Sequence, residues 1–490
     1  MTMTNQPAPQ PNEDRSIVTR LDNWLDQRTG IDSILHEALD EPIPGGAKWA
    51  YVFGSGLLFL FVSQIITGIC LALYYVPSAD HAHTIVSYIV KEVTAGSFIR
   101  SIHAYGSSGI IILLALHIGQ TILYGSYKGR RELLWLSGCI LLALMLGMAF
   151  TGYLLPWDEK AYFASAVGTN LIAEVPWIGP LLQKLVRGGD QMGTLTISRF
   201  YVLHVFILPG LLIAFIAAHV FSFRKAGAAG PIKEDPVHPR LPPVPFYPGQ
   251  VAIDAIFAIV LIGILAIIAI KIPMDLGPAA NPADTSFLPR PEWYYRPAFQ
   301  WLKYLSGRWS LIGGIILPAV LALIFAAVPF LDRRLERRPW RRPISVGAFL
   351  LFLIAYTSLG VASYRDDHRD PGVAAQMQKQ DEDTKSFMEK PFVPEAAAGS
   401  ASAALVAADP KVLKGLAIFN ANSCNSCHGD GGVGTAAAGP LTGVGQKYTD
   451  PQLIALLRAP DSKMSGGGMT PVDLSQDDLE ALVTYLRQLH

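Results

Sequence analysis

Arg100-Ser-Ile-His-Ala-Tyr-Gly106, continuing to Leu-Leu-Ala-Leu-His117, is the stretch of sequence that decides the fold. It opens an apolar run long enough for a membrane-spanning helix, which needs about 20 residues. Two histidines, His103 and His117, lie inside this run and are fourteen positions apart. That spacing places both within about 40° of one helix face and roughly 21 Å apart along the axis. Because ionisable residues inside hydrocarbon are costly and usually functional, the stretch predicts a helix that carries two ligands at different depths.

A second apolar run, residues 200–223, carries His204 and His219 fifteen positions apart, again within about 60° of one face. Two such helices that face each other with their histidines at matching depths would form two bis-histidine sites. Haem iron takes axial ligands on both sides of a flat ring, so two stacked porphyrins are the favoured cofactors. The alternative is that each histidine is a hydrogen-bonded polar residue of a helix bundle, and the matching spacing on two helices argues against it.

The composition is that of a membrane protein, because 51% of the 490 residues are hydrophobic and only 16% are charged. The formal net charge is zero, so charge gives no indication of nucleic acid as a partner. Seven apolar runs predict an all-α bundle of seven transmembrane helices. These runs lie near residues 50–75, 101–124, 133–154, 200–223, 250–271, 310–331 and 344–363.

Basic residues follow the second, fourth and sixth predicted spans, and an excess of such residues marks the cytoplasmic side. The amino terminus is therefore predicted in the cytoplasm, and seven spans bring the carboxyl-terminal part to the periplasmic side of the inner membrane. The basic residues are Lys128, Arg130, Arg131, Arg224, Lys225, Lys233, Arg333, Arg334, Arg337, Arg338, Arg341 and Arg342.

Composition divides the chain into five segments. Residues 1–46 are expected to form a cytoplasmic surface segment, 47–230 a four-helix haem domain and 231–364 a three-helix domain. Residues 365–410 are polar and then rich in Ala, Pro and Ser, which predicts a flexible linker with a reach of about 35–40 Å. Residues 411–490 are expected to form a small soluble helical domain.

The sequence Cys424-Asn-Ser-Cys427-His428 is a c-type haem attachment signature. Two thiols about one helical turn apart can add to two vinyl groups, and the adjacent imidazole then lies under the iron. We expect Met469 to be the second axial ligand, with Met464 as the alternative. A zinc knuckle or a redox dithiol would also use this spacing, but no second Cys or His pair accompanies it. Haem is attached outside the cytoplasm, which agrees with the predicted orientation.

Glycines repeat the interval between the histidines. Gly54 and Gly68 are fourteen positions apart in the first span, and Gly138 and Gly152 are fourteen apart in the third. A porphyrin edge held among four helices would collide with side chains on the flanking pair, and glycine removes that collision. Ordinary small-residue packing of membrane helices is the alternative, but two pairs that match the histidine spacing favour the porphyrin.

Five stretches together resemble cytochrome b of quinol:cytochrome c oxidoreductases, the bc1/b6f family, fused to a class I cytochrome c. The b-like resemblance covers residues 18–364, and the c-like resemblance covers 411–490. Three features resemble the b6f branch: the fifteen-residue histidine interval, Pro-Trp-Asp, and the end of the b part after a seventh helix. The stretches are Gly-Ser-Gly…Gln-Ile-Ile-Thr-Gly (54–68), Arg-Ser-Ile-His (100–103), Gly-Tyr-Leu-Leu-Pro-Trp-Asp (152–158), Ser-Arg-Phe-Tyr-Val-Leu-His (198–204) and Pro-Glu-Trp-Tyr (291–294).

The resemblance implies that both b haems lie within the first four helices. It pairs His103 with His204 at the haem nearer the outside and His117 with His219 at the inner haem. Arg100, about one turn before His103, is then expected to pair with a haem propionate.

In the family, the Pro-Glu-Trp-Tyr motif lines the pocket in which quinol is oxidised. The resemblance makes Glu292 the acceptor of a quinol proton. It also implies that Trp293 and Tyr294 shape the pocket, with Tyr153 contributing from the opposite side. Taken alone, Glu292 beside prolines would be a solvated loop carboxylate.

The sequence departs from the family pattern at residues expected near the cytoplasmic end of the membrane bundle. Val52 stands where the b6f branch has a haem-attaching cysteine, so we expect no extra covalent haem there. Gln120 replaces a basic residue expected to contact the inner haem. The inner quinone pocket is poorly specified, and its candidates are Arg224, Asp40 and Glu41.

The resemblance therefore predicts a core subunit that oxidises membrane quinol outside, relays electrons through two b haems to an inner quinone, and builds a proton gradient. It implies a Rieske iron–sulfur partner, a terminal acceptor such as an oxidase or a soluble cytochrome, and a homodimer. Two other functions stay open: a b-type haem membrane anchor of a quinone-reducing dehydrogenase or hydrogenase, and a transporter or receptor with a haem-sensing tail.

Overall fold

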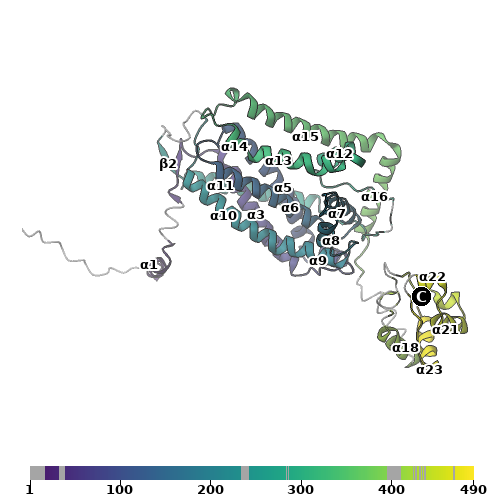
Figure 1. Ribbon diagram of the computed structural model, residues 1–490. Helices are drawn as coiled ribbons and strands as arrows, with labels where there is room; N and C mark the ends of the chain where they lie inside the picture. Colours follow the sequence, from purple (N-terminus) through teal and green to yellow (C-terminus); the bar gives the residue numbers. More distant parts are fainter. Residues whose placement is uncertain are drawn as a thin grey trace, which may run out of the picture. The chain divides into compact units, whose positions relative to one another are not determined.

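The computed structural model describes most of the chain in two compact units, residues 1–391 and 392–490, which are treated separately below (Figure 1). The described residues are 17–31, 39–232, 242–282, 284, 286–393, 410–422, 424, 428–429, 432, 434, 438–466 and 469–489.

Among its described residues, the first unit contains seven helices that are long and apolar enough to cross a membrane, which confirms the predicted all-α bundle. Each follows one of the seven apolar runs. They are α3 (Val52–Ala72), α5 (Gly96–Tyr124), α6 (Glu132–Tyr153), the continuous α9 (Thr194–Val202), η2 (Leu203–Ile207) and α10 (Leu208–Ala226), α11 (Gly249–Lys271), the continuous η3 (Gly307–Trp309), η4 (Ile312–Ile316) and α13 (Leu317–Ala326), and α15 (Pro343–Arg369).

Two of these spans contain a π-helical turn, η2 and η4. Each turn ends two residues before a proline, Pro209 in the fourth span and Pro318 in the sixth. A proline ring inside a helix collides with the carbonyl group four residues earlier and cannot donate a hydrogen bond. Here that carbonyl belongs to the π turn, whose wider winding accommodates one additional residue. The two prolines therefore account for the interruptions.

Short elements complete the first unit. Strands β1 (Pro42–Pro44) and β2 (Pro243–Pro245) pair antiparallel. Figure 1 shows β2 at one end of the bundle and α7, α8, α12 and α16 at the other. The short elements are α1 (Ile17–Thr29), η1 (Trp49–Tyr51), α4 (Ala82–Lys91), α7 (Glu159–Ala173), α8 (Gly179–Arg187), α12 (Arg296–Tyr304), α14 (Val328–Leu331), η5 (Pro339–Arg341) and α16 (Pro371–Glu389).

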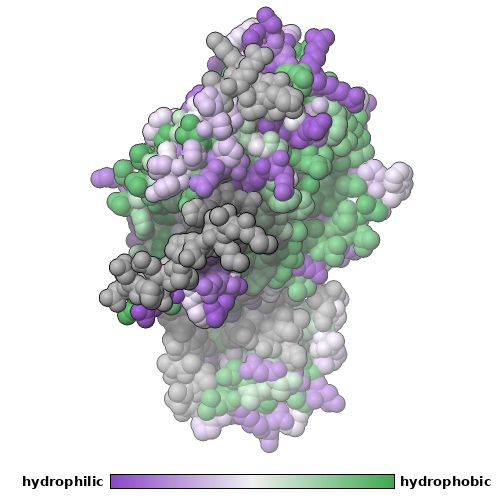
Figure 2. All heavy atoms as spheres, turned by 90° about the vertical axis from the view of Figure 1, so that its left-hand side faces the viewer, coloured by the Kyte–Doolittle hydropathy of each residue, from purple (hydrophilic) through white to green (hydrophobic). Residues whose placement is uncertain are grey.

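The surface follows the membrane prediction. Figure 2 looks onto the end at which β2 lies and shows hydrophilic side chains over that end and hydrophobic ones along the flank. Large apolar side chains such as Ile259 and Leu351 are 68% and 67% exposed. Such exposure is favourable only if lipid covers these flanks.

The loops after the second, fourth and sixth spans meet at the β2 end, as their basic residues predict. Lys128 donates to the Asp332 carboxylate at 2.6 Å, and Arg131 donates to the Gly227 carbonyl at 3.1 Å. Burial alone would raise the pKa of Asp332, but the hydrogen bond from Lys128 and those of two neighbouring hydroxyl groups hold that pKa below its usual value. The three loops therefore lie on one side of the membrane, and the identity of that side stays a prediction.

The predicted linker begins too early. Residues 365–369 continue helix α15, and residues 371–389 form helix α16. Asp370 caps α16 by accepting hydrogen bonds from the backbone N–H groups of Gly372 and Val373, and Pro371 occupies the first turn. The polar composition hid this helix. The prediction of a flexible linker is therefore wrong for residues 365–389, and residues 394–409 lie outside the described residues.

The second unit is a small helical domain built from α18 (Pro410–Ala421), α20 (Val444–Lys447), α21 (Asp450–Arg458), α22 (Ser462–Gly466) and α23 (Gln476–Leu486). Its core joins Val412 and Phe419 of α18 to Leu479 and Tyr485 of α23. A Cβ atom at Gly415 would collide with the backbone of α23, so this glycine allows the two helices to cross closely.

Candidate functional site

The four transmembrane histidines form the two predicted pairs. The ring centroids of His103 on α5 and His204 on η2 are 6.2 Å apart, with ring planes at 75°. His117 and His219 line one cavity of about 480 Å³ between α5 and α10. The structure thus brings the histidines together at matching depths, and their role as haem ligands stays a prediction.

The π turn explains the fifteen-residue interval between His204 and His219. It lies at Leu203–Ile207, and His204 is one of its members. One extra residue in a π turn leaves the following turns in phase with a regular helix. The fifteen residues on this helix therefore cover the same number of turns as the fourteen between His103 and His117.

Each of the four glycines faces one imidazole. A Cβ atom built on Gly54 would lie 3.7 Å from Cε1 of His117, one on Gly68 would lie 3.1 Å from that of His103, and one on Gly138 would lie 3.3 Å from that of His219. At Gly152 the added atom would collide with the His204 ring. Alanine at Gly68, Gly138 or Gly152 would press on the facing ring, whereas at Gly54 it would reach only ordinary van der Waals contact.

Three of the four imidazoles are oriented by hydrogen bonds at Nδ1. His103 is 2.9 Å from Thr67 Oγ1, and His219 is 2.9 Å from Ser137 Oγ. His204 Nδ1 lies 3.1 Å from the Met148 carbonyl oxygen. A ligating histidine typically engages its second nitrogen in this way, which leaves Nε2 for a metal. His117 Nδ1 is buried and has no partner among the described residues.

The geometry fits haem iron. Metal–imidazole nitrogen bonds are about 2 Å long, so ring centroids 6.2 Å apart leave room for one iron between His103 and His204. The cavity that contains His117 and His219 has the volume of a typical cofactor pocket. The residues present therefore suit two porphyrins held by paired imidazoles.

The same cavity opens toward the β2 end, where polar residues line it. Arg224 and Glu41 both line it and form an ion pair at 3.3 Å, whereas Asp40 is not among its lining residues. Gln120 also lines it. Sequence reasoning missed Asp254, a carboxylate inside α11 that accepts a hydrogen bond from Gln250 and faces the cavity. An ionisable residue within a span is the signal that could have identified it.

Val52, at the start of α3, is 2% exposed. The expectation of no covalent haem at this position stays a prediction.

The Pro-Glu-Trp-Tyr motif lies at the opposite end, immediately before α12. The Glu292 carboxylate pairs with Lys160 Nζ at 3.2 Å. Lys160 Nζ also lies 6.0 Å from the Tyr153 ring centroid, and the Tyr153 hydroxyl donates to the Arg290 carbonyl at 3.5 Å. Tyr294 is 5% exposed, and burial raises the pKa of its phenol, which therefore stays protonated. The structure thus gathers Glu292, Tyr153 and Tyr294 in one region.

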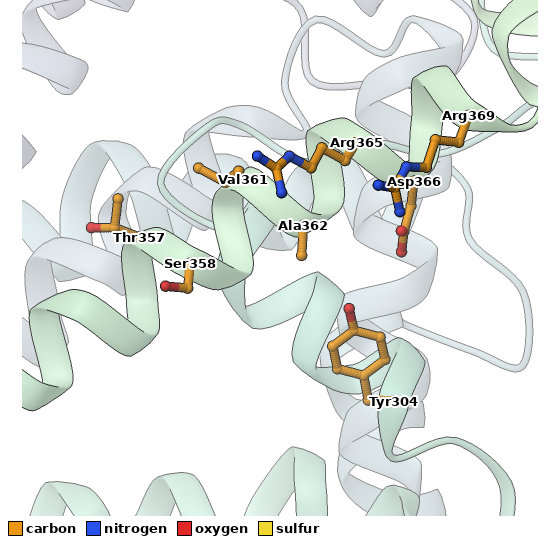
Figure 3. Close-up of a pocket in the computed structure, with 8 residues that line it drawn as sticks. All are labelled: Tyr304, Thr357, Ser358, Val361, Ala362, Arg365, Asp366 and Arg369. Carbon is orange, nitrogen blue, oxygen red and sulfur yellow. The ribbon is translucent and has the colours of Figure 1, made fainter.

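Asp367 bridges the two ends of this motif. Its carboxylate accepts hydrogen bonds from Arg290 at 2.6 Å and Arg296 at 2.5 Å, and it is 1% exposed. Pro-Glu-Trp-Tyr therefore lies between two arginines fixed to one buried carboxylate. Its neighbour Asp366 instead lines a hollow of about 370 Å³ together with Tyr304. Figure 3 shows these two side chains on α15 and α12. Nothing in the sequence indicated the Asp367 bridge.

The Arg100 guanidinium is bonded to backbone carbonyl groups of the protein. It donates to the carbonyl oxygens of Met274 at 2.7 Å and Asp275 at 2.9 Å. It thereby fixes the start of the segment that leads to Glu292. The pairing of Arg100 with a haem propionate stays a prediction.

In the second unit, His428 and Met469 stay the predicted axial ligands of a c-type haem. His428 Nδ1 lies 3.3 Å from the Gly439 carbonyl oxygen, which leaves Nε2 for iron. Met469 and Cys424 pack against the domain core, whereas Met464 is not part of that core cluster. Cys427 lies outside the described residues.

We expect Met469→Ala to lower the reduction potential of the covalent haem by about 100 mV or more, because a methionine ligand raises that potential. Met464→Ala is the matched control and should leave the potential unchanged. Redox titration of the purified chain measures both values. A fall caused by Met464→Ala instead would assign the ligand to Met464.

Paired imidazoles within a membrane bundle, joined to a Cys-x-x-Cys-His domain, define a membrane-bound electron-transfer protein. Three family models match the chain: cytochrome b/b6/petB at residues 38–227, cytochrome b (C-terminal)/b6/petD at 279–377, and cytochrome c at 412–490. The chain belongs to the cytochrome b family and carries a cytochrome c domain at its carboxyl-terminal end. Haem cofactors follow from both families.

Individual proteins agree with this assignment. The cytochrome b subunit of a cytochrome bc complex from Chlorobaculum thiosulfatiphilum is 35% identical over 67% of this chain and 77% of its own length. Cytochrome b of Rhodobacter capsulatus is 32% identical over 65% and 76%. Cytochrome b/c1 of Bradyrhizobium diazoefficiens is 32% identical over 69% of this chain and 49% of its own length. A solved hyperthermophilic respiratory Complex III matches with a TM-score of 0.63 and 26% identity, covering 75% of this chain and 96% of that one.

The family models serve both the bc1 and the b6f branches, so the likeness to b6f stays a prediction. The family matches do establish that the chain is the cytochrome b of a bc-type complex with a fused cytochrome c, and that its role is electron transfer.

Proposed function

We propose that the chain is the core subunit of a proton-translocating quinol:cytochrome c oxidoreductase that oxidises quinol beside Glu292. The observation that carries the proposal is the Glu292 region itself. The Glu292 carboxylate pairs with Lys160, a half-exposed lysine, and lies among Tyr153, Trp293 and Tyr294. The motif is anchored to the haem helices, because Trp293 donates to Ser108 of α5 and Tyr295 donates to the Leu146 carbonyl of α6.

Glu292 acts in this proposal as the acceptor of a proton from the quinol hydroxyl. Lys160 holds the Glu292 carboxylate in an ion pair at 3.2 Å, and a quinol hydroxyl that reaches the carboxylate would replace this partner. Tyr294 stays protonated and offers a fixed surface for the quinol ring. The proton then leaves on the side to which Lys160 is exposed.

Two b haems, bound by His103 with His204 and by His117 with His219, would relay one electron across the membrane, and a Rieske iron–sulfur partner would take the other. At the inner end, Arg224, Glu41 and Asp254 offer charged and proton-exchanging groups to a quinone.

The cytochrome c domain, reached through residues 394–409, would pass the Rieske electron to an oxidase or a soluble cytochrome. The proposed complex is a homodimer in the cytoplasmic membrane, with the basic loops inside and the Glu292 end and the cytochrome c domain outside. These orientations rest on the distribution of basic residues.

We expect Glu292→Gln to reduce quinol oxidation by about 100-fold or more, because removal of a general base typically costs that factor. Haem content should stay unchanged. Glu174→Gln is the control, since Glu174 terminates the same helix that carries Lys160 but bonds to Ser310. Quinol-dependent reduction of the b haems in purified membranes measures the effect.

The same variant separates this function from the b-type haem anchor of a dehydrogenase or hydrogenase. An anchor reduces quinone and has no use for a base at Glu292, so full activity of Glu292→Gln would favour it. A transporter or receptor with a haem-sensing tail would show no b haem in protein that lacks residues 394–490.

A further inference from the structure

Helix α16 lies along the segment that leads to Glu292. The family model for the carboxyl-terminal part of cytochrome b ends at residue 377, so the second half of α16 is outside the family match. One face of α16 is partly buried, and its members recur every three or four positions. They are Val373, Gln376, Met377, Gln380, Thr384, Phe387 and Met388.

This face is bonded to the backbone of the described residues from 274 to 288. Gln380 accepts from the Leu288 N–H at 3.1 Å and donates to the Leu288 carbonyl at 3.4 Å. Near the other end of α16, Met388 Sδ accepts from the Leu276 N–H at 3.4 Å. Gln380 thus satisfies both backbone groups of a residue three positions before Pro291.

The carboxyl-terminal end of α16 is held by α4. Lys91 Nζ donates to the carbonyl oxygens of Phe387 at 2.6 Å and Lys390 at 2.7 Å, and it lies 4.2 Å from the Phe387 ring centroid. A cation at this end is favoured by the helix dipole. His83, also on α4, packs against Phe387 with ring centroids 5.1 Å apart and ring planes at 54°.

The other side of the segment is fixed by the haem-bearing part of the bundle. Arg100 holds the Met274 and Asp275 carbonyl groups. His83 Nε2 lies 2.8 Å from the Gly277 carbonyl oxygen, and burial lowers the pKa of His83, so a neutral ring donates this bond. The segment is therefore enclosed between α16 on one side and α4 and α5 on the other.

We infer that α16 is a positioning element of the quinol pocket. Gln380 and Met388 bond to the described residues from 274 to 288, and Lys91 with Phe387 holds α16 against α4, so that together these contacts set the place of Glu292. This inference rests on the proposed oxidation of quinol at Glu292. It implies that one helix both shapes the pocket and begins the connection to the cytochrome c domain.

The test uses full-length protein with Gln380→Leu, which keeps the side-chain size and removes both hydrogen bonds to Leu288. Gln378→Leu is the matched control, because Gln378 lies on the exposed face of the same helix and its side chain bonds to Glu382 of that helix. Hydrogen–deuterium exchange of the peptide 274–295 should become about tenfold faster in Gln380→Leu and stay unchanged in Gln378→Leu. Unchanged exchange in Gln380→Leu would overturn the inference.

Steady-state kinetics with decylubiquinol give the functional readout. Because a displaced proton acceptor slows the chemical step, we expect Gln380→Leu to lower kcat several-fold at unchanged haem content. Faster exchange without any change in KM or kcat would restrict α16 to local packing and overturn its role in positioning. Lys91→Met should repeat the effect and Lys91→Arg should restore it, which keeps the test decisive if Gln380→Leu fails to accumulate.

Failure of the proposed function has a different signature. If Glu292→Gln oxidises quinol normally, the pocket is elsewhere. Hydrogen–deuterium exchange of the peptide 274–295 then still decides whether α16 holds this segment. The proposed effect of α16 on quinol oxidation through Glu292 is overturned in that case.

Discussion

His204→Leu should remove one of two non-covalent haems from the purified chain and leave the covalent haem in place. The His204 ring faces His103 across 6.2 Å, a separation suited to one iron between them. Leucine fills a similar volume but cannot ligate iron, and a single remaining imidazole binds the porphyrin weakly. The covalent haem is predicted at Cys424-x-x-Cys427-His428 in the separate cytochrome c unit and should therefore be insensitive to this change. Haem extraction and quantification per polypeptide give the answer, with two removable haems expected before the change and one after it.

Gly210→Ala provides the control for His204→Leu. Gly210 lies on α10, the continuation of the same span, and a Cβ atom there meets nothing within 4 Å. This variant should keep both removable haems. His219→Leu should remove the other haem, and the double variant should retain none. Full retention of both haems by the double variant would contradict the assignment of all four histidines.

Asp367→Asn should impair quinol oxidation at least tenfold and lower thermal stability. Removing the charge of a buried carboxylate that pairs with two cations leaves them uncompensated, which costs about 3–5 kcal/mol for fully buried groups. The arginines are 16% and 24% exposed, so we expect the lower end of that range, about 3 kcal/mol. Because Arg290 and Arg296 flank Glu292, the loss of these ion pairs destabilises the proposed pocket most. The ratio kcat/KM and the midpoint of thermal unfolding are the quantities to measure.

The neighbouring carboxylate supplies the comparison. Asp366 accepts from Gln300 and lies 3.8 Å from Lys303, at the hollow between α12 and α15 rather than at the motif. Asp366→Asn should therefore have a much smaller effect on quinol oxidation. Equal effects of the two substitutions would show that the acidic pair acts through general stability and not through the Asp367 bridge.

The sequence was sufficient for the parts of the site that lie on regular helices. The spacing of His103 and His117 converts directly into depth and direction, because a straight helix fixes both. The paired glycines repeat that spacing, and the structure places each of them against an imidazole. Helix length and hydropathy likewise sufficed for the seven spans, since a bilayer imposes a minimum length.

Contacts between distant segments were not accessible in this way. Asp367 meets Arg290 from 77 positions along the chain, and no local pattern encodes such a pair. Asp254 was overlooked because it sits near the start of an otherwise apolar span. Helix α16 was assigned to a linker on composition, although Asp370-Pro371 is a local helix-start signal that composition ignores.

The π turn at Leu203–Ile207 has a consequence for how relatives of this chain can differ in length. Losing one residue from the turn would convert it to regular winding and still leave His204 and His219 in phase. Losing one residue between His103 and His117, where the helix is regular, would rotate one ligand by about 100° away from its iron. The fourth span can therefore lose one residue and keep both histidines on the same face, whereas the second span cannot.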